Sequence, residues 1–275
     1  MENIKIGLDL GLSSIKIIIT NNKKEILIRK LVDNDKCDIT LLDEYLIGLL
    51  NKSKVEYIVE QVIITGIGQN RIDKVLNTRP IFVDEIQAIG YGAQVVSSLN
   101  DCIVVSIGTG TAFVNCHNNV VEHIGGSALG GGTIIGIGDR MFNTTRFKDI
   151  INYAVQGEVN KSDRMIKKDY TKNDGSNMLI TASNLGNASE EFVNDFDIMI
   201  GCIKMVVQNV CIMAALYAKQ YQQNNIVITG SLANLEQVYD IAKDVGILHD
   251  VNFIVGKSPM YTTLTGAMQL SEKEE

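Results

Sequence analysis

The sequence has few of the residues that indicate a linker, a disulfide framework or a zinc site. Only two of its 275 residues are proline, and no low-complexity stretch occurs, so no flexible linker is predicted. The five cysteines are odd in number and include no Cys-x-x-Cys pair; they are Cys37, Cys102, Cys116, Cys202 and Cys211. We therefore expect reduced, mostly buried thiols instead of disulfides or zinc ligands.

Positive charge is scarce as well. The chain carries 25 Lys and Arg against 32 Asp and Glu, a formal net charge of −7, which argues against a broad basic surface for nucleic acid. Residues 1–5 lack the basic start and apolar stretch of a signal peptide, and no apolar run is expected to span a membrane. We therefore predict a soluble, cytoplasmic protein with neither nucleic acid nor membrane as a partner.

Hydrophobic residues make up 45% of the chain, enough for one large domain or two packed lobes. Residues 4–10, 15–20 and 25–32 predict three antiparallel strands joined by hairpins. Strands of the same kind are predicted at 102–107, 112–116 and 120–124. A strand unit that ends in a turn of Gly, Ser and Thr thus occurs twice, which predicts two related α/β lobes around a cleft, with a boundary near Asn100.

The remaining segments alternate between helix and strand patterns. Helices are predicted at 40–50 with Thr40 as the N-cap, at 85–98, within 188–222 with Ser189 as a cap, at 232–245 and at 261–270. Short strands are predicted at 62–65, 81–83, 226–229 and 252–255. Residues 125–138 form a glycine-rich stretch, and 161–176 are expected to be a polar connector.

Two turns have the composition of phosphate-binding loops. In Gly7-Leu8-Asp9-Leu10-Gly11-Leu12-Ser13-Ser14-Ile15-Lys16, backbone N–H groups and hydroxyls at the turn suit phosphate oxygens, and Lys16 adds positive charge. Asp9, at the strand end, suits Mg²⁺ held through water. Residues 106–111 repeat the pattern. Each turn alone is explained equally well by an ordinary hairpin, but two matching copies favour a phosphate chain held from both lobes.

Three further segments suit the same chemistry. Residues 125–133 predict a helix whose N-terminus faces the cleft as an anion site, with a flexible loop as the alternative. Gly230 and Ser231 favour close approach of adenosine, or simply close packing of a strand on a helix. Asp84 and Glu85 predict a carboxylate that orients or deprotonates a hydroxyl, although acids at a helix start also stabilise its dipole.

These motifs, in this order, resemble the acetate and sugar kinase/Hsc70/actin superfamily, and within it the type II pantothenate kinases over nearly the whole chain. The resemblance rests on Gly-Leu-Asp-Leu-Gly at 7–11 with Lys16, Phe-Val-Asp-Glu at 82–85, Ser-Ile-Gly-Thr-Gly-Thr at 106–111, Gly-Gly-Ser-Ala-Leu-Gly-Gly-Gly-Thr at 125–133, Thr-Ala-Ser-Asn-Leu-Gly-Asn at 181–187, Ile-Thr-Gly-Ser at 228–231, and Gly266 with Ala267.

The resemblance implies an actin-like (ribonuclease H-like) α/β fold with a nucleotide cleft between lobes 1–99 and 100–275. It also implies a homodimer formed through the long helix within 188–222, for which a core helix is the simple alternative. The implied reaction is phosphorylation of pantothenate by ATP with Mg²⁺, with Glu85 as the general base. The residues implied for ATP are Asp9 (which would also hold Mg²⁺ through water), Gly11, Ser13, Ser14, Lys16, Gly108, Gly130, Gly131, Gly132, Thr133, Gly230 and Ser231. Those implied for the substrate are Thr109, Gly110, Thr111, His123 and Gly125.

Three positions differ from the family pattern. Leu12 stands where the first loop usually has a second glycine, His123 where an arginine holds substrate, and Gln87 where an aspartate is usual. Histidine offers fewer donors than arginine and is mostly neutral at pH 7. Two alternatives therefore stay open: a kinase of this fold for another small hydroxyl compound, and a non-catalytic protein that binds ATP.

Overall fold

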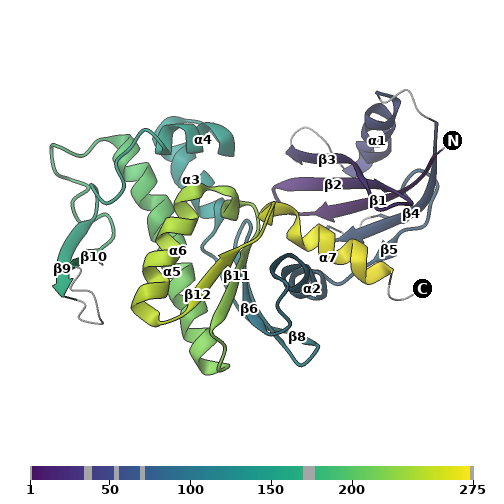
Figure 1. Ribbon diagram of the computed structural model, residues 1–275. Helices are drawn as coiled ribbons and strands as arrows, with labels where there is room; N and C mark the ends of the chain where they lie inside the picture. The colour runs from purple at the N-terminus through teal and green to yellow at the C-terminus, as the bar shows by residue number, and fades with distance from the viewer. Residues whose placement is uncertain (1, 34–38, 53–55, 69–71, 170–176, 273–275) are drawn as a thin grey trace.

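Segments rich in apolar, β-branched residues build two five-stranded sheets, one in each half of the molecule (Figure 1). The computed structural model describes residues 2–33, 39–52, 56–68, 72–169 and 177–272. The first sheet contains β1 (Glu2–Leu10), β2 (Ser14–Asn21), β3 (Ile26–Asp33), β4 (Tyr57–Thr65) and β5 (Ile81–Phe82). The second contains β6 (Cys102–Ile107), β7 (Thr111–His117), β8 (Val120–Ser127), β11 (Asn225–Thr229) and β12 (Asn252–Val255).

The two sheets have the same topology, which confirms the predicted repetition. The first has the order β3-β2-β1-β4-β5, and the second, read from its β8 edge, has the order β8-β7-β6-β11-β12. In each sheet the first three strands are antiparallel and the last two run parallel to the central one. The β1–β2 turn of one sheet therefore corresponds to the β6–β7 turn of the other.

Seven α-helices surround these sheets in the part of the chain that the structure describes. They are α1 (Leu42–Asn51), α2 (Glu85–Ser97), α3 (Gly131–Phe142), α4 (Phe147–Ala154), α5 (Asp195–Gln220), α6 (Glu236–His249) and α7 (Thr262–Ser271). Short 3-10 turns occur at Ile39–Leu41, Leu232–Asn234 and Pro259–Tyr261.

The helices form layers around the sheets. α1 covers one face of the first sheet, where its leucines join the isoleucines of β1 and β2 in one core. The other face is covered by α7, since Leu264 packs on Ile18. α2 covers the second sheet on the side of Val104 and Val114, and α5 covers the opposite side, so that α2 and α7 lie between the two sheets (Figure 1).

α2 and α7 cross with their backbones in contact. A methyl group on Gly266 would overlap the carbonyl oxygen of Ala88, and one on Gly92 would overlap that of Thr262. Because each helix covers a different sheet, this crossing joins the two halves and sets the position of the α2 N-terminus relative to both.

Two predicted helix caps are wrong. Thr40 lies in a 3-10 turn, and α1 begins after Leu41 without a side-chain cap, since that turn already leads the backbone into the helix. Ser189 does not cap α5. The helix begins at Asp195, because the Asn194 side chain accepts hydrogen bonds from the N–H groups of Phe196 and Asp197, which satisfies two of the unpaired donors of the first turn.

The polar connector predicted at 161–176 contains a strand. β9 (Arg164–Asp169) pairs with β10 (Asn177–Ser183) as an antiparallel hairpin, and residues 170–176 lie outside the described part. The base of this hairpin is held by the buried Lys204 of α5, whose ammonium donates to Asp163 Oδ2 (2.8 Å) and Thr181 Oγ1 (2.7 Å). One polar residue of the predicted connector, Asp163, thus pairs with a buried cation.

The cysteine prediction is confirmed for Cys102, Cys116, Cys202 and Cys211, which are buried free thiols; Cys37 lies outside the described residues.

The expectation that no apolar segment has the length of a membrane span is wrong. α5 is long and apolar enough by length and composition, but two thirds of its most apolar window is buried. Buried core helices meet the same criteria, and α5 packs against α3, α4 and α6.

We expect the α2–α7 crossing to tolerate no side chain at Gly266. Gly266→Ala should lower the urea midpoint, with a loss of about 1–3 kcal/mol from overpacking against Ala88. Gly136→Ala is the control, because Gly136 lies in α3 with nothing within 4 Å of an added Cβ. It should gain up to about 1 kcal/mol from helix propensity. Equal stability of Gly266→Ala and wild type would contradict the close crossing.

Candidate functional site

The β1–β2 turn is organised around a buried ion pair. Asp9 and Lys16 are register partners on adjacent strands, and the Lys16 ammonium donates to Asp9 Oδ2 at 2.8 Å. Their side chains are 5% and 13% exposed, so the charges depend on each other for compensation. The turn between them is closed by the Gly11 N–H, which donates to the Ser14 carbonyl (3.1 Å). Leu12, at the tip, is 63% exposed.

The β6–β7 turn lies directly against the first one. Its Gly108 N–H donates to the Gly110 carbonyl at 2.8 Å, and the Thr111 hydroxyl donates to the Leu129 carbonyl. Ser13 Oγ and Thr109 Oγ1 are 3.0 Å apart and share a hydrogen bond. Tertiary folding therefore brings together the two turns that the sequence identified separately.

The predicted helix after the glycine-rich stretch is present as α3, which begins at Gly131 after the cap residue Gly130. Its first N–H groups are used within the protein: Gly131 donates to the Gly108 carbonyl (2.8 Å) and Gly132 to that of Thr109 (2.9 Å). The Thr133 hydroxyl donates to the Ala128 carbonyl at 3.2 Å. Residues 130–133 therefore support the shape of the β6–β7 turn.

Glu85 is the first residue of α2 and is half-buried. The helix is capped by Asp84, whose carboxylate accepts from the Gln87 N–H at 3.0 Å. Burial raises the pKa of the Glu85 carboxyl, the carboxylate of Asp9 raises it further, and the Lys16 ammonium acts in the opposite direction. Glu85 thus stands close enough to the Asp9–Lys16 pair to be coupled to both charges.

His123 and Gly125, both predicted to bind substrate, lie on opposite faces of β8. His123 is exposed and pairs with Val114, which faces α2. Gly125 pairs with Phe113 on the α5 face, and a methyl group there would overlap the hydroxyl of Tyr217. A register shift between Phe113 and Val114 separates the two positions. The structure therefore places His123, and not Gly125, on the same side of the sheet as Glu85.

Gly230 and Ser231 follow β11 beside the end of β6. Gly230 has a φ of +94°, which favours glycine, and any side chain there would overlap the Ile107 carbonyl next to the β6–β7 turn. The first sheet has a counterpart that the sequence analysis missed: Gly66, with a φ of +93°, beside Leu10 and Asp9. The repeated Ile-Thr-Gly at 64–66 and 228–230 was the available signal.

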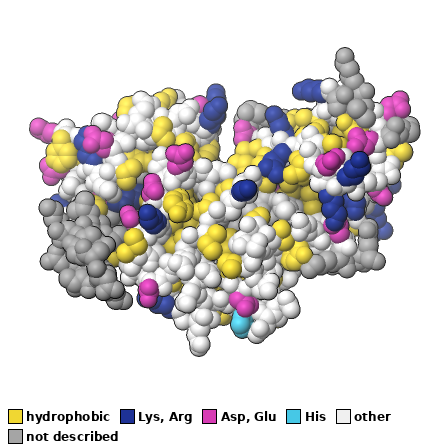
Figure 2. Space-filling view, viewed as in Figure 1, with side chains coloured by type: hydrophobic (Ala, Val, Ile, Leu, Met, Phe, Trp, Pro, Cys, Tyr) yellow, Lys and Arg dark blue, Asp and Glu magenta, His cyan; other side chains and the backbone are white. Residues whose placement is uncertain are grey.

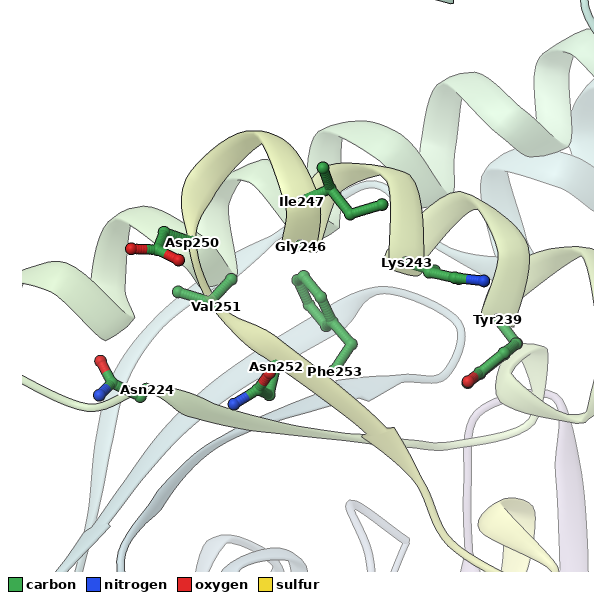
Figure 3. Close-up of a pocket in the computed structure, with 9 residues that line it drawn as sticks. All are labelled: Asn224, Tyr239, Lys243, Gly246, Ile247, Asp250, Val251, Asn252 and Phe253. Carbon is green, nitrogen blue, oxygen red and sulfur yellow. The ribbon is translucent and has the colours of Figure 1, made fainter. Parts of the chain in front are cut away.

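The space-filling view shows the surface hollowed between the two halves at the upper edge (Figure 2). Two open pockets in the described part of the chain lie elsewhere. One, of about 500 Å³, lies between α6 and β12, with Tyr239, Lys243 and Phe253 around it (Figure 3). The other, of about 510 Å³, lies between α5, α6 and the β9–β10 hairpin. Neither contains a residue predicted for the site.

Solved structures with the same fold extend over the whole chain. The activator of 2-hydroxyisocaproyl-CoA dehydratase from Clostridium difficile, with bound ADPNP, has a TM-score of 0.63 at 16% identity and covers 100% of this chain and 98% of its own. A ROK family glucokinase from Streptomyces griseus, in complex with glucose and AMPPNP, has a TM-score of 0.61 at 12% identity and covers 98% and 99%. The predicted actin-like α/β fold is therefore confirmed.

Two proteins similar in sequence to this chain belong to the family that the motifs resemble. A type II pantothenate kinase from Staphylococcus epidermidis is 27% identical over 248 residues, which is 86% of this chain and 88% of that protein. One from Bacillus thuringiensis subsp. konkukian is 26% identical over 239 residues, 82% of each. The model of the Fumble family matches residues 92–239, more than half of the chain, and the chain therefore belongs to the Fumble family.

Proposed function

We propose that the chain is a pantothenate kinase, which uses ATP to convert pantothenate to 4'-phosphopantothenate, the first step of coenzyme A biosynthesis. The observation that carries the proposal is the meeting of the two turns at Ser13 and Thr109, with Glu85 coupled to Asp9 and Lys16 at the same place. A phosphate chain held from two sides next to a carboxylate is what phosphoryl transfer to a hydroxyl requires. The relatives named type II pantothenate kinase supply the acceptor.

In this proposal the two turns divide the nucleotide between them. Lys16 and the β1–β2 turn hold phosphate oxygens from one side, and the β6–β7 turn, supported by residues 130–133, holds the transferred group and the acceptor from the other. Adenosine lies at Gly230 and Ser231, next to the end of β6. His123, on the α2 face of β8, contacts the acceptor beyond Glu85. Gly125 takes part only indirectly, as the position that admits the Tyr217 hydroxyl.

Glu85 acts on the acceptor hydroxyl. As the hydroxyl oxygen forms its bond to the γ-phosphorus, the Glu85 carboxylate accepts the proton, and the bond between the γ-phosphorus and the bridging oxygen breaks to release ADP. The raised pKa of Glu85 brings its basicity closer to neutral pH than that of an ordinary carboxylate. The Lys16 ammonium lies where negative charge develops on the phosphate oxygens.

The residues present fit a magnesium ion bound together with ATP. In the described part of the chain, no three His, Cys, Asp or Glu side chains group to hold a metal. Mg²⁺ bound with nucleotide needs no such cage, because it keeps several waters and takes phosphate oxygens as ligands. Asp9 is the candidate to hold it, since Lys16 occupies only Oδ2. When bound, the ion neutralises charge on the phosphate oxygens.

The proposed enzyme has two lobes and a dimer interface. The lobes are residues 1–99 and 100–275, with the nucleotide in the cleft between them and the α2–α7 crossing as their connection. The protein works in the cytoplasm as a homodimer. Asn209 and Leu216 are exposed two turns apart on α5, and Leu216 is 55% exposed, which makes this face of the helix the candidate interface.

The direct test is ADP release by the purified protein with Mg-ATP, with and without pantothenate, together with mass spectrometry of the product. We expect pantothenate-dependent ADP release and one added phosphate on pantothenate. ATP binding without release would reject the proposal and favour one of the two alternatives. A panel of small hydroxyl compounds separates a kinase for another acceptor from a protein that only binds ATP.

Glu85→Gln should abolish phosphoryl transfer while ATP affinity, measured by calorimetry, is retained.

In wild type, kcat/KM should fall as the pH falls through the raised pKa of Glu85. The acid limb of the pH profile of kcat/KM should therefore lie above the pKa of an ordinary glutamate. The folded state binds this proton more readily than the unfolded state, so ionised Glu85 destabilises the fold above its folded-state pKa. Glu85→Gln should therefore raise the melting temperature at pH 8. Retained turnover would exclude Glu85 as the base.

His123→Arg should lower the KM for pantothenate several-fold with little change in kcat, because a guanidinium adds a permanent charge and a planar set of donors for the acceptor carboxylate. His117→Arg is the matched control. His117 also lies at the surface of the second sheet, but its ring is 3.2 Å from Asp101, which follows the C-terminal end of α2, whereas Glu85 begins that helix. An unchanged KM in His123→Arg would remove His123 from the acceptor site.

A further inference from the structure

Thr65 is the last residue of β4, and its hydroxyl is a buried polar group of unexplained role. Its side chain is fully buried, and in the described part of the chain its hydroxyl has no hydrogen-bond partner. Buried hydroxyls in folded proteins are almost always satisfied by protein, ordered water or a ligand. The residues around this hydroxyl therefore indicate which hydrogen-bond partner it takes.

Thr65 stands beside Asp9. The two are register partners at the carboxyl ends of the parallel strands β1 and β4, so their side chains lie on the same face of the sheet, the face that α7 covers. Asp9 Oδ2 is taken by Lys16, whereas Oδ1 lies toward Gly66, where an added Cβ would be 2.9 Å away. Oδ1, which does not accept from Lys16, thus lies next to Gly66, the residue that follows Thr65.

The duplicated fold provides an internal comparison. Thr229 ends β11 at the matching position of the second sheet, is fully buried, and also has no partner for its hydroxyl among the described residues. Its register partner on the central strand is Ser106, which carries no charge. Both sheets therefore present a buried hydroxyl at the same edge, but only Thr65 presents one next to a carboxylate.

We propose that Thr65 is a positioning residue that, with Asp9 Oδ1, holds one water of the magnesium–nucleotide complex. The inference rests on the proposed function, which puts Mg-ATP at this edge of the sheet. A water that donates one hydrogen to Asp9 Oδ1 and the other to Thr65 Oγ1 leaves its oxygen lone pair for the metal. Thr65 would thereby let a carboxylate already paired with Lys16 reach the ion indirectly.

The test compares Thr65→Val, which keeps the shape and removes the hydroxyl, with Thr65→Ser, which keeps the hydroxyl. Ser162→Ala is the control, because Ser162 is also fully buried with an unpartnered hydroxyl but lies against Gly201 of α5. Calorimetry with ATP, in Mg²⁺ and in EDTA, gives the ratio of the two affinities for each protein. We expect wild type, Thr65→Ser and Ser162→Ala to prefer Mg-ATP, and Thr65→Val to lose about tenfold of that preference.

Each other result rejects the inference. An unchanged ratio in Thr65→Val, an equal loss for both forms of ATP, or the same loss in Thr65→Ser would show that the hydroxyl holds no metal-bound water. The same would follow if wild type had no preference for Mg-ATP. ADP release should fall in Thr65→Val through kcat, with the KM for pantothenate unchanged. If wild type phosphorylates no pantothenate, the proposed function fails, and the calorimetric ratio still decides the role of Thr65.

Discussion

The crossing of α2 and α7 is the constraint on which the site depends. At Gly92 and Gly266 the helix backbones touch, because neither position carries a side chain. α2 packs on the second sheet and α7 on the first, so the contact fixes one sheet against the other through two short helices. Glu85 is the first residue of α2, and its distance from the Asp9–Lys16 pair is therefore set by the packing between the halves.

Burial and the neighbouring charges make ionisation of the Glu85 carboxyl less favourable. The carboxylates of Asp9 and Asp84 raise the pKa of Glu85, and the Lys16 ammonium lowers it. Burial and repulsion raise the pKa of Glu85, which means that its ionised form is destabilised where it would accept a proton. The apolar cores on the α1 and α5 faces supply the stability that such a site requires.

Local patterns predicted the elements better than their ends. Apolar segments bounded by turn residues placed both sets of three antiparallel strands. The turn at Asn118 and Asn119 has the left-handed backbone that asparagine tolerates. The start of α5 was missed because Ser189 and Asn194 are both of a capping residue type, and only the structure shows that Asn194 bonds the first turn. The β9–β10 hairpin was missed because its base is held by a distant residue: Asp163, just before β9, and Thr181 of β10 accept from the buried Lys204 ammonium, more than 20 residues away.

The sequence by itself determined the repeated strand-and-turn unit, because strand propensity and turn chemistry act over a few neighbouring positions. The actin-like fold and the candidate site residues came from the resemblance of the ordered motifs to a known family. Tertiary structure alone decided which of these residues meet. Ser13 contacts Thr109 across 96 positions, Thr65 lies beside Asp9, and His123 and Gly125 separate to opposite faces of β8 at a register shift. Register and helix crossing depend on how whole faces pack, and no local pattern in the chain carries that information.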